Sequence, residues 1–160
     1  MRQLFAALSL ALIAGAATAQ EAVPVSTIDL WNADRALVFD ATEIDVDDLK
    51  WLARPVVVFA DSPNDPRFVQ QIDLLADRPD DLAERDVIIV VDTNPDARSD
   101  LRLQLRPRGF MLVIMGKDGQ VELRKPAPWD VREISRSIDK MPLRQQEIED
   151  RRAPPVPPTE

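Results

Sequence analysis

Short apolar runs alternate along the chain with segments of helical periodicity. Three runs are apolar, apart from Asp86 at the start of the second, and contain many β-branched residues; they span residues 55–60, 86–91 and 110–115. Such runs are typical of strands that are covered on both faces of a sheet. Between the first two runs, Asp65-Pro66 offers a good cap and first residue for a helix, and apolar residues follow at helical spacing. This pattern predicts two buried strands joined by a helix.

The second half of the chain predicts a further helix and a hairpin. Asn94-Pro95 marks a helix start, and Leu101 and Leu105 lie one turn apart on the inner face of that helix. The sequence Gly-Lys-Asp-Gly at residues 116–119 is typical of a hairpin turn. It follows the third apolar run and leads into residues 121–125, which alternate as in a half-exposed strand.

A last helix is predicted from Pro128 to Pro142, and a strand near residues 36–39 and a short helix over residues 45–52 precede the first apolar run. The core order is therefore β-α-β-α-β-β-α. Two strands joined by a helix run parallel with a right-handed crossover, whereas a hairpin adds an antiparallel strand. The predicted fold is α/β and thioredoxin-like, with a mixed central sheet and helices on both faces, over residues 28–147.

The two ends of the chain differ from this core. Residues 1–19 combine a positive start, an apolar run and a small-x-small site, as in a signal peptide that is cleaved after Ala19. The apolar run is too short to span a bilayer, so no stable membrane anchor is expected. Residues 20–27 are predicted to be a flexible lead-in, and residues 148–160 a Pro-rich disordered tail. The expected location is periplasmic or secreted.

The composition narrows the possible partners and cofactors. The chain has 28 Asp and Glu against 20 Lys and Arg, which argues against nucleic acid and leaves an unknown envelope protein or a small ligand. It has no Cys and no His, so thiol catalysis and imidazole or thiolate metal ligands are excluded. The acidic stretches at residues 45–48 and 61–65 are not followed by the Gly and Glu that complete a calcium-binding loop. We therefore expect no metal and no cofactor.

The redox site of thioredoxin-like proteins is missing from two places in this sequence. Those proteins carry Cys-x-x-Cys in the loop after the first core strand, where the helix dipole lowers a thiol pKa. Pro63 and Pro66 stand near these positions here, and neither side chain can react. A cis-proline precedes the third core strand in thioredoxins, but this chain has Gly109 there and its nearest proline, Pro107, lies earlier. A disulfide-exchange function is therefore excluded.

Several short stretches resemble one family in their order and spacing. The resemblance is to an uncharacterised thioredoxin-like domain, nicknamed DUDES, of exported bacterial proteins and of vertebrate sushi-repeat and coiled-coil-domain extracellular proteins. It covers about residues 45–147 and implies a thioredoxin-like fold without an established activity or catalytic residues. The stretches are residues 49–55 (LKWLARP), 84–86 (ERD), 116–119 (GKDG) with Arg124, and 138–144 (IDKMPLR).

A polar cleft is expected where the core strands end, because ligands of open α/β sheets bind beyond the carboxyl ends of the strands. The helix start at Pro66 offers free backbone N–H groups that could hold an anion. The alternative is purely structural: Asp65 caps the helix and Asp61 pairs with a neighbouring Arg. The candidate ligand-binding residues are Asp61, Ser62, Asn64, Arg67, Asp92, Arg106 and Arg108.

Two functions from different classes fit this sequence. The first is a redox-inactive binding or structural protein of the cell envelope. The second is a hydrolase-like enzyme without a thiol, in which Asp61, Asp92 and Arg67 would be the working groups. Outside the cleft, Trp51 and Trp129 are expected to pack in the core. The charged run after Pro142 is either a surface extension that packs against a partner or a frayed helix.

Overall fold

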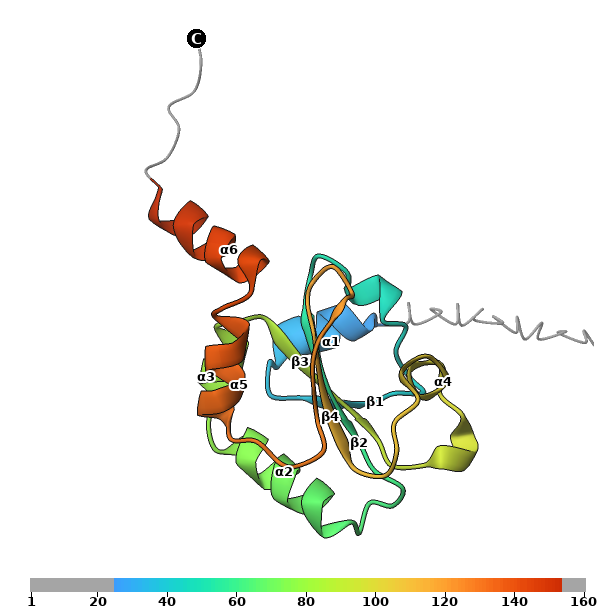
Figure 1. Ribbon diagram of the computed structural model, residues 1–160. Coiled ribbons are helices and arrows are strands. Elements are labelled where there is room, and N and C mark those ends of the chain that lie inside the picture. The colour runs from blue at the N-terminus through green and yellow to red at the C-terminus, as the bar shows by residue number, and fades with distance from the viewer. Residues whose placement is uncertain (1–24, 154–160) are drawn as a thin grey trace, which may run out of the picture.

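Five strands form one mixed sheet in the computed structural model, which describes residues 25–153 (Figure 1). The predicted signal peptide, most of the lead-in and the last residues of the tail lie outside the described residues. The strands lie in the order β1-β3-β2-β4-β5. They are β1 (Val38–Asp40), β2 (Arg54–Phe59), β3 (Val87–Asp92), β4 (Met111–Met115) and β5 (Val121–Lys125).

The strand directions agree with the predicted topology for β2, β3 and the hairpin, but not for β4 relative to β3. β1 and β2 both pair with β3 in parallel, whereas β4 is antiparallel to β2 and β5 is antiparallel to β4. The parallel pairing of β2 with β3 and the antiparallel β4–β5 hairpin are as predicted. A parallel β4 was expected because a helical segment joins it to β3, and this expectation is wrong: β4 starts at the end of the sheet where β3 finishes and runs back beside β2. The fold is α/β and thioredoxin-like, as expected.

Six helices and two 3₁₀ turns surround the sheet in the described part of the chain. One face is covered by α2, α3 and α5, and the other by α1, η1 and α4 (Figure 1). The elements are α1 (Thr27–Ala33), η1 (Asp47–Leu49), α2 (Pro66–Ala76), α3 (Pro79–Ala83), η2 (Pro95–Ala97), α4 (Asp100–Leu105), α5 (Val131–Ile138) and α6 (Pro142–Arg152).

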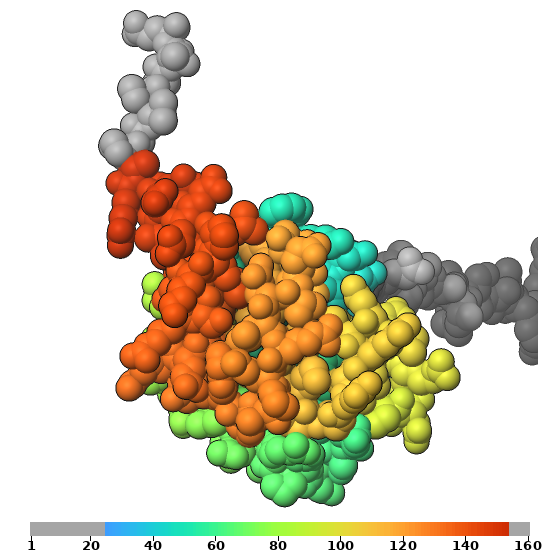
Figure 2. Space-filling view, viewed as in Figure 1, coloured from blue at the N-terminus to red at the C-terminus, as the bar shows by residue number. Residues whose placement is uncertain are grey.

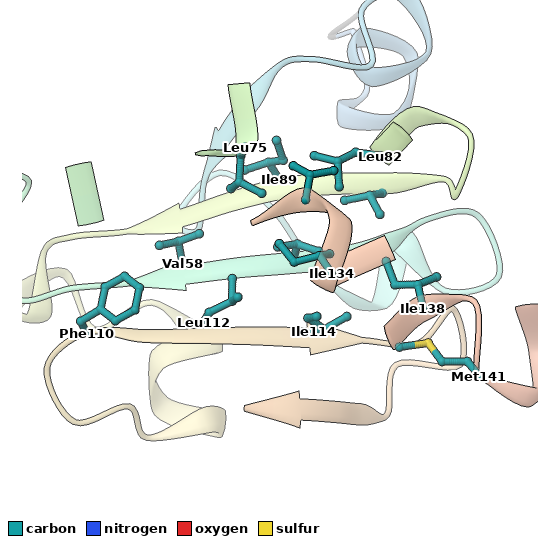
Figure 3. Close-up of a cluster of buried hydrophobic side chains, with 13 residues drawn as sticks. Val58, Leu75, Leu82, Ile89, Phe110, Leu112, Ile114, Ile134, Ile138 and Met141 are labelled. Carbon is teal, nitrogen blue, oxygen red and sulfur yellow. The ribbon is translucent and has the colours of Figure 1, made fainter. Parts of the chain in front are cut away.

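Alternate residues of the central strands enter different cores. Val58 and Ile114 face the α2, α3 and α5 side, where they pack with Ile134 and Ile138 of α5 (Figure 3). The residues between them face the other side; Val57, for example, packs in the cluster that contains Leu101 and Leu105 of α4. Because both faces are covered, these strands are apolar at every position except Arg54, which begins β2, and Asp92, which ends β3.

Two helical segments differ from the prediction. The segment from Asn94 is not one helix: Asn94 caps η2, Arg98 adopts a left-handed conformation, and Ser99 caps α4 with its own side chain. The last predicted helix is shorter at its start, because Asp130 rather than Pro128 provides the N-cap of α5. In both places a second good capping residue lies a few positions further along the chain, Ser99 for α4 and Asp130 for α5, and the helix starts there.

The ends of the domain also differ from the expected boundaries. Pro142 ends one helix and begins another: α6 runs from Pro142 to Arg152, across the expected start of the tail at residue 148. A Pro at the first helical position is favourable because its missing N–H has no intrahelical partner there. At the other end, Ser26 caps α1, so the last residues of the predicted lead-in are helical. No helix within residues 25–153 is long and apolar enough to cross a membrane.

Candidate functional site

Four of the predicted site residues lie together in the loop after β2 and at the start of α2. Asp65 caps α2 by accepting a hydrogen bond from the Arg67 N–H at 2.8 Å, and its carboxylate also pairs with the Arg67 guanidinium at 3.2 Å. These hydrogen bonds from Arg67 lower the pKa of Asp65. Ser62 accepts from the backbone N–H of Asn64, which shapes the loop. Here the polar side chains serve local backbone geometry.

Asp92 ends β3 with a carboxylate that is only 3% exposed. The Ser99 hydroxyl donates to one carboxylate oxygen, and the Arg102 Nε and Nη2 atoms donate to the other at 3.0 and 2.8 Å. Arg102 also donates to the Ala60 carbonyl at 2.7 Å and so ties the end of β2 to the end of β3. Asp92 and Arg102 therefore satisfy one another, and neither group offers a free charge to a ligand. Arg102 is absent from the predicted set because its pairing depends on the turn at Arg98.

Asp61 and Arg67 both lie beside Gly109. A side-chain carbon at Gly109 would lie 3.9 Å from both Asp61 Oδ2 and Arg67 Nη2. Asp61 also lies 3.6 Å from Arg102 through Oδ1. The carboxyl ends of the strands thus bring together Asp61, Arg67 and Asp92, whereas Arg106 and Arg108 are exposed on the segment that leads to β4.

The amino ends of the same strands carry a second polar cluster, which the sequence analysis did not select. Arg54, at the start of β2, is fully buried and donates to Glu147 Oε1 at 2.7 Å and to the Arg85 carbonyl at 2.9 Å. The Lys117 ammonium lies 2.8 Å from Asp86 and 3.2 Å from Glu147. Burial alone would raise the pKa of Glu147, but hydrogen bonds from Arg54 and Lys117 lower it to about 2.

A second group of charges extends this cluster along α6. Arg85 donates to both carboxylate oxygens of Asp139, at 3.0 and 2.7 Å, and this carboxylate raises the pKa of Arg85 despite the opposing effect of burial. Arg144 is almost fully buried and donates to Glu147 at 3.3 Å. We call the whole cluster the amino-end network. Its members are Arg54, Arg85, Asp86, Lys117, Asp139, Arg144 and Glu147.

Trp51 lies next to this network and is not in the core, so the expected packing of Trp51 is wrong. Its side chain is 67% exposed, and its φ is 66°, in the left-handed region that bulky residues rarely adopt. The backbone N–H of Trp51 donates to the Lys117 carbonyl at 2.7 Å. Trp129 does pack against the core, and the Lys125 ammonium lies 4.2 Å from the centroid of its ring.

The stretches that carry the family resemblance supply most of this region. Residues 49–55 contain Trp51 and Arg54, residues 84–86 and 116–119 contribute Arg85, Asp86 and Lys117, and residues 138–144 contribute Asp139 and Arg144. These stretches are far apart in the sequence and meet only at the amino ends of the strands. Lys117 lies in the predicted hairpin turn, at the end of the sheet opposite the cleft.

Two cavities lie away from the predicted cleft. One of about 150 Å³ is lined by apolar residues and opens at the edge of β1 beside Val38, Ile72 and Pro79. Another, of about 130 Å³, lies between the hairpin and the start of α6 and is lined in part by Arg54, Lys117 and Met141. In the same part of the chain, no three acidic, His or Cys side chains come close enough to hold a metal ion.

Comparisons with known proteins agree with the resemblance at the level of the domain. A family model described as a domain of unknown function (DUF4174) matches residues 45–147, which include the whole amino-end network. A search of curated proteins found no match. Among solved structures, chloroplastic thioredoxin z is similar, with 19% identity and a TM-score of 0.48 over 64% of this chain and 92% of that one.

Proposed function

We propose that this chain, which belongs to the family of the domain of unknown function DUF4174, is a redox-inactive binding or structural module of the cell envelope. The pattern of residues 1–19 supports export to the periplasm or the medium. The absence of Cys supports a role without thiol chemistry. We also propose that it is of the type nicknamed DUDES, shared with vertebrate extracellular proteins, on the strength of the sequence stretches that resemble it.

The state of Asp92 is the observation that carries this proposal. A catalytic carboxylate needs a free oxygen that can reach a substrate or a water. In Asp92 one oxygen accepts from Ser99 and the other accepts twice from Arg102, and the side chain is buried. At the end of the sheet where thioredoxin-like proteins carry their reactive groups, Asp92, Ser99 and Arg102 thus bind one another.

The enzyme alternative requires Asp61, Asp92 and Arg67 to act together on a substrate. Asp92 has no free oxygen for that purpose, and Arg67 already pairs with Asp65. The exposed residues of the loop and of the approach to β4, together with the half-buried Ser62, still offer polar groups to a ligand. They are Asp61, Ser62, Asn64, Arg67, Arg106 and Arg108.

A substrate screen combined with variants tests the proposal. The protein should turn over no ester, glycoside or phosphate substrate in the presence of added Mg²⁺, Ca²⁺ or Mn²⁺. Asp61→Ala and Arg67→Ala should fold normally, with Asp73→Ala and Arg78→Ala as exposed controls elsewhere on the surface. Turnover that is lost in Asp61→Ala but kept in Asp73→Ala would establish the enzyme alternative instead.

A further inference from the structure

We infer that the exposed Trp51 and its surroundings dock a basic peptide segment of a protein partner, with an Arg or Lys side chain stacked on the indole ring. This inference deepens the proposed binding function and rests on it. It assigns the interaction surface to the amino ends of the strands. The loop after β2, where the cleft was predicted, is at the opposite end of the sheet.

Trp51 is exposed at a conformational cost. A left-handed backbone conformation is unfavourable for residues with a side chain, and most of all for bulky ones. Trp51 nevertheless has a φ of 66°. The neighbouring Leu52 is also exposed, at 49%. An exposed Trp beside an exposed Leu is unusual for a surface that serves only solvation, because Trp is the residue most enriched at the energetic centres of protein interfaces.

The surroundings hold Trp51 in place. Its N–H is fixed by the Lys117 carbonyl, and the Lys117 ammonium is in turn fixed by Asp86 and Glu147 of the amino-end network. The turn before Trp51 and the hairpin lie side by side at the upper edge of the molecule (Figures 1 and 2). They touch closely: a side-chain carbon at Gly119 would lie 2.9 Å from the Lys50 Cε atom. A rigid support of this kind lowers the entropy that an interface loses on binding.

The charge around Trp51 indicates the chemistry of the partner. Residues 45–50, which lead directly into Trp51, carry three carboxylates and one ammonium, and the three acidic residues are all exposed. The ammonium, on Lys50, is paired with Asp47 at 2.8 Å. Asp118 and Glu122 add negative charge from the hairpin and the start of β5. The three acidic residues of the segment are Asp45, Asp47 and Asp48.

A basic segment is the occupant that satisfies both the aromatic ring and its acidic surroundings. The face of an indole attracts a guanidinium or ammonium group, and carboxylates nearby strengthen the local negative potential. An anionic peptide or an anionic lipid surface would meet like charge at the same place. A purely apolar partner would leave the carboxylates without a counter-charge.

Titration with defined peptides tests this inference. We would measure the binding of a short alternating Arg-Gly peptide to the purified full chain by calorimetry, with an alternating Glu-Gly peptide as the negative probe. The Arg-Gly peptide should bind, and its affinity should fall as salt is added. Trp51→Gly should weaken binding about tenfold, while its thermal midpoint should not fall because Gly suits a positive φ. Leu103→Ala, at another exposed apolar residue on α4, should leave affinity unchanged.

Charge variants provide the second comparison. Asp48→Asn should weaken binding of the Arg-Gly peptide, whereas Asp73→Asn on α2 should not. Equal weakening by the two variants would show that only the net charge of the protein matters and would overturn the docking surface. Unchanged affinity in Trp51→Gly, or equally tight binding of the Glu-Gly peptide, would overturn it as well. So would sedimentation showing a dimer that Trp51→Gly dissociates, because a second copy would then be the occupant.

These outcomes are separate from those of the proposed function. Turnover in the substrate screen would contradict the binding module even if the Arg-Gly peptide bound at Trp51. Failure of the peptide titration together with an absence of turnover would leave a binding or structural module whose surface is elsewhere.

Discussion

The two ends of the sheet use charged residues in opposite ways. At the carboxyl ends the closest ion pairs are local: Asp65 with Arg67, and Asp92 with Arg102, ten positions along the chain. The more distant pair there, Asp61 with Arg102, is longer, at 3.6 Å. At the amino ends the partners are distant, as in Arg54 with Glu147, which are 93 positions apart. Local pairs shape a turn or a helix start. The distant pairs fix the hairpin and α6 against the strands, and in doing so they hold the backbone that exposes Trp51.

The comparison also shows that burial alone does not mark a functional end. Asp92 and Arg54 are both buried charged residues at strand ends. Each is matched by an opposite charge, as burial in a medium of low dielectric requires. What distinguishes the amino end is the exposed apolar group that the charged residues support.

Loss of Arg54 should have the largest effect on stability. Arg54→Ala removes the buried guanidinium that donates to Glu147 and to the Arg85 carbonyl, and removing one member of a buried ion pair costs about 3–5 kcal/mol. Urea denaturation should show this loss. Arg78→Ala, which breaks the exposed pair with Asp81, is the control and should cost under about 1 kcal/mol. A similar small cost for both variants would mean that the amino-end network does not stabilise the fold.

Loss of Asp92 should have the next largest effect. Asp92→Ala leaves the Arg102 guanidinium and the Ser99 hydroxyl without their acceptor, and unpaired buried groups cost about 2–3 kcal/mol. Asp61→Ala, at the exposed neighbour in the same cleft, should change the free energy of unfolding by less than about 0.5 kcal/mol. If the order of these two effects were reversed, the structural role of Asp92 would be wrong.

Acid should weaken the amino-end network through Glu147. Its pKa is about 2 in the folded chain and has the ordinary value of 4.5 in the unfolded chain. Because the pKa is lower in the folded chain, ionised Glu147 stabilises the fold in full above the pKa of the unfolded chain. This stabilisation is lost as the pH falls from about 4.5 to about 2. The loss should be roughly 2 kcal/mol after screening by solvent. Unfolding measured across this range should show a smaller pH dependence in Glu147→Gln; the same slope in both proteins would contradict the assignment.

The smallest predicted effect is a gain in stability. Trp51→Gly removes an exposed side chain from a left-handed backbone and should stabilise the fold by up to about 1 kcal/mol. Trp31→Ala is the contrasting variant, because Trp31 is buried and donates to the Val87 carbonyl; it should destabilise by about 3–5 kcal/mol. Destabilisation by Trp51→Gly would show that Trp51 packs in the native protein after all.

The sequence was sufficient where the signals were local. The apolar runs predicted β2, β3 and β4, and Asp65-Pro66 predicted the start of α2, because strand burial and helix capping depend on neighbouring residues. The positions of Asp61 and Arg67 at the carboxyl ends followed from the predicted topology alone.

The sequence was insufficient where partners are distant or the backbone is unusual. No spacing rule links Arg54 with Glu147, so the amino-end network could not be predicted from local pattern. The exposure of Trp51 depends on a positive φ that its hydrogen bond to the Lys117 carbonyl sets, and propensity predicts the opposite for a Trp. The break between η2 and α4 likewise depends on the left-handed Arg98.

Mapping of amide chemical shifts during the Arg-Gly titration tests the contrast between the two ends most directly. With the full chain, the account predicts shifts at Lys50, Trp51 and Leu52 and at the hairpin residues 117–119, and no shifts at Asp61, Arg67 or Gly109. Shifts confined to the loop after β2 and the segment before β4 would contradict it, because the binding surface would then lie at the carboxyl ends of the strands.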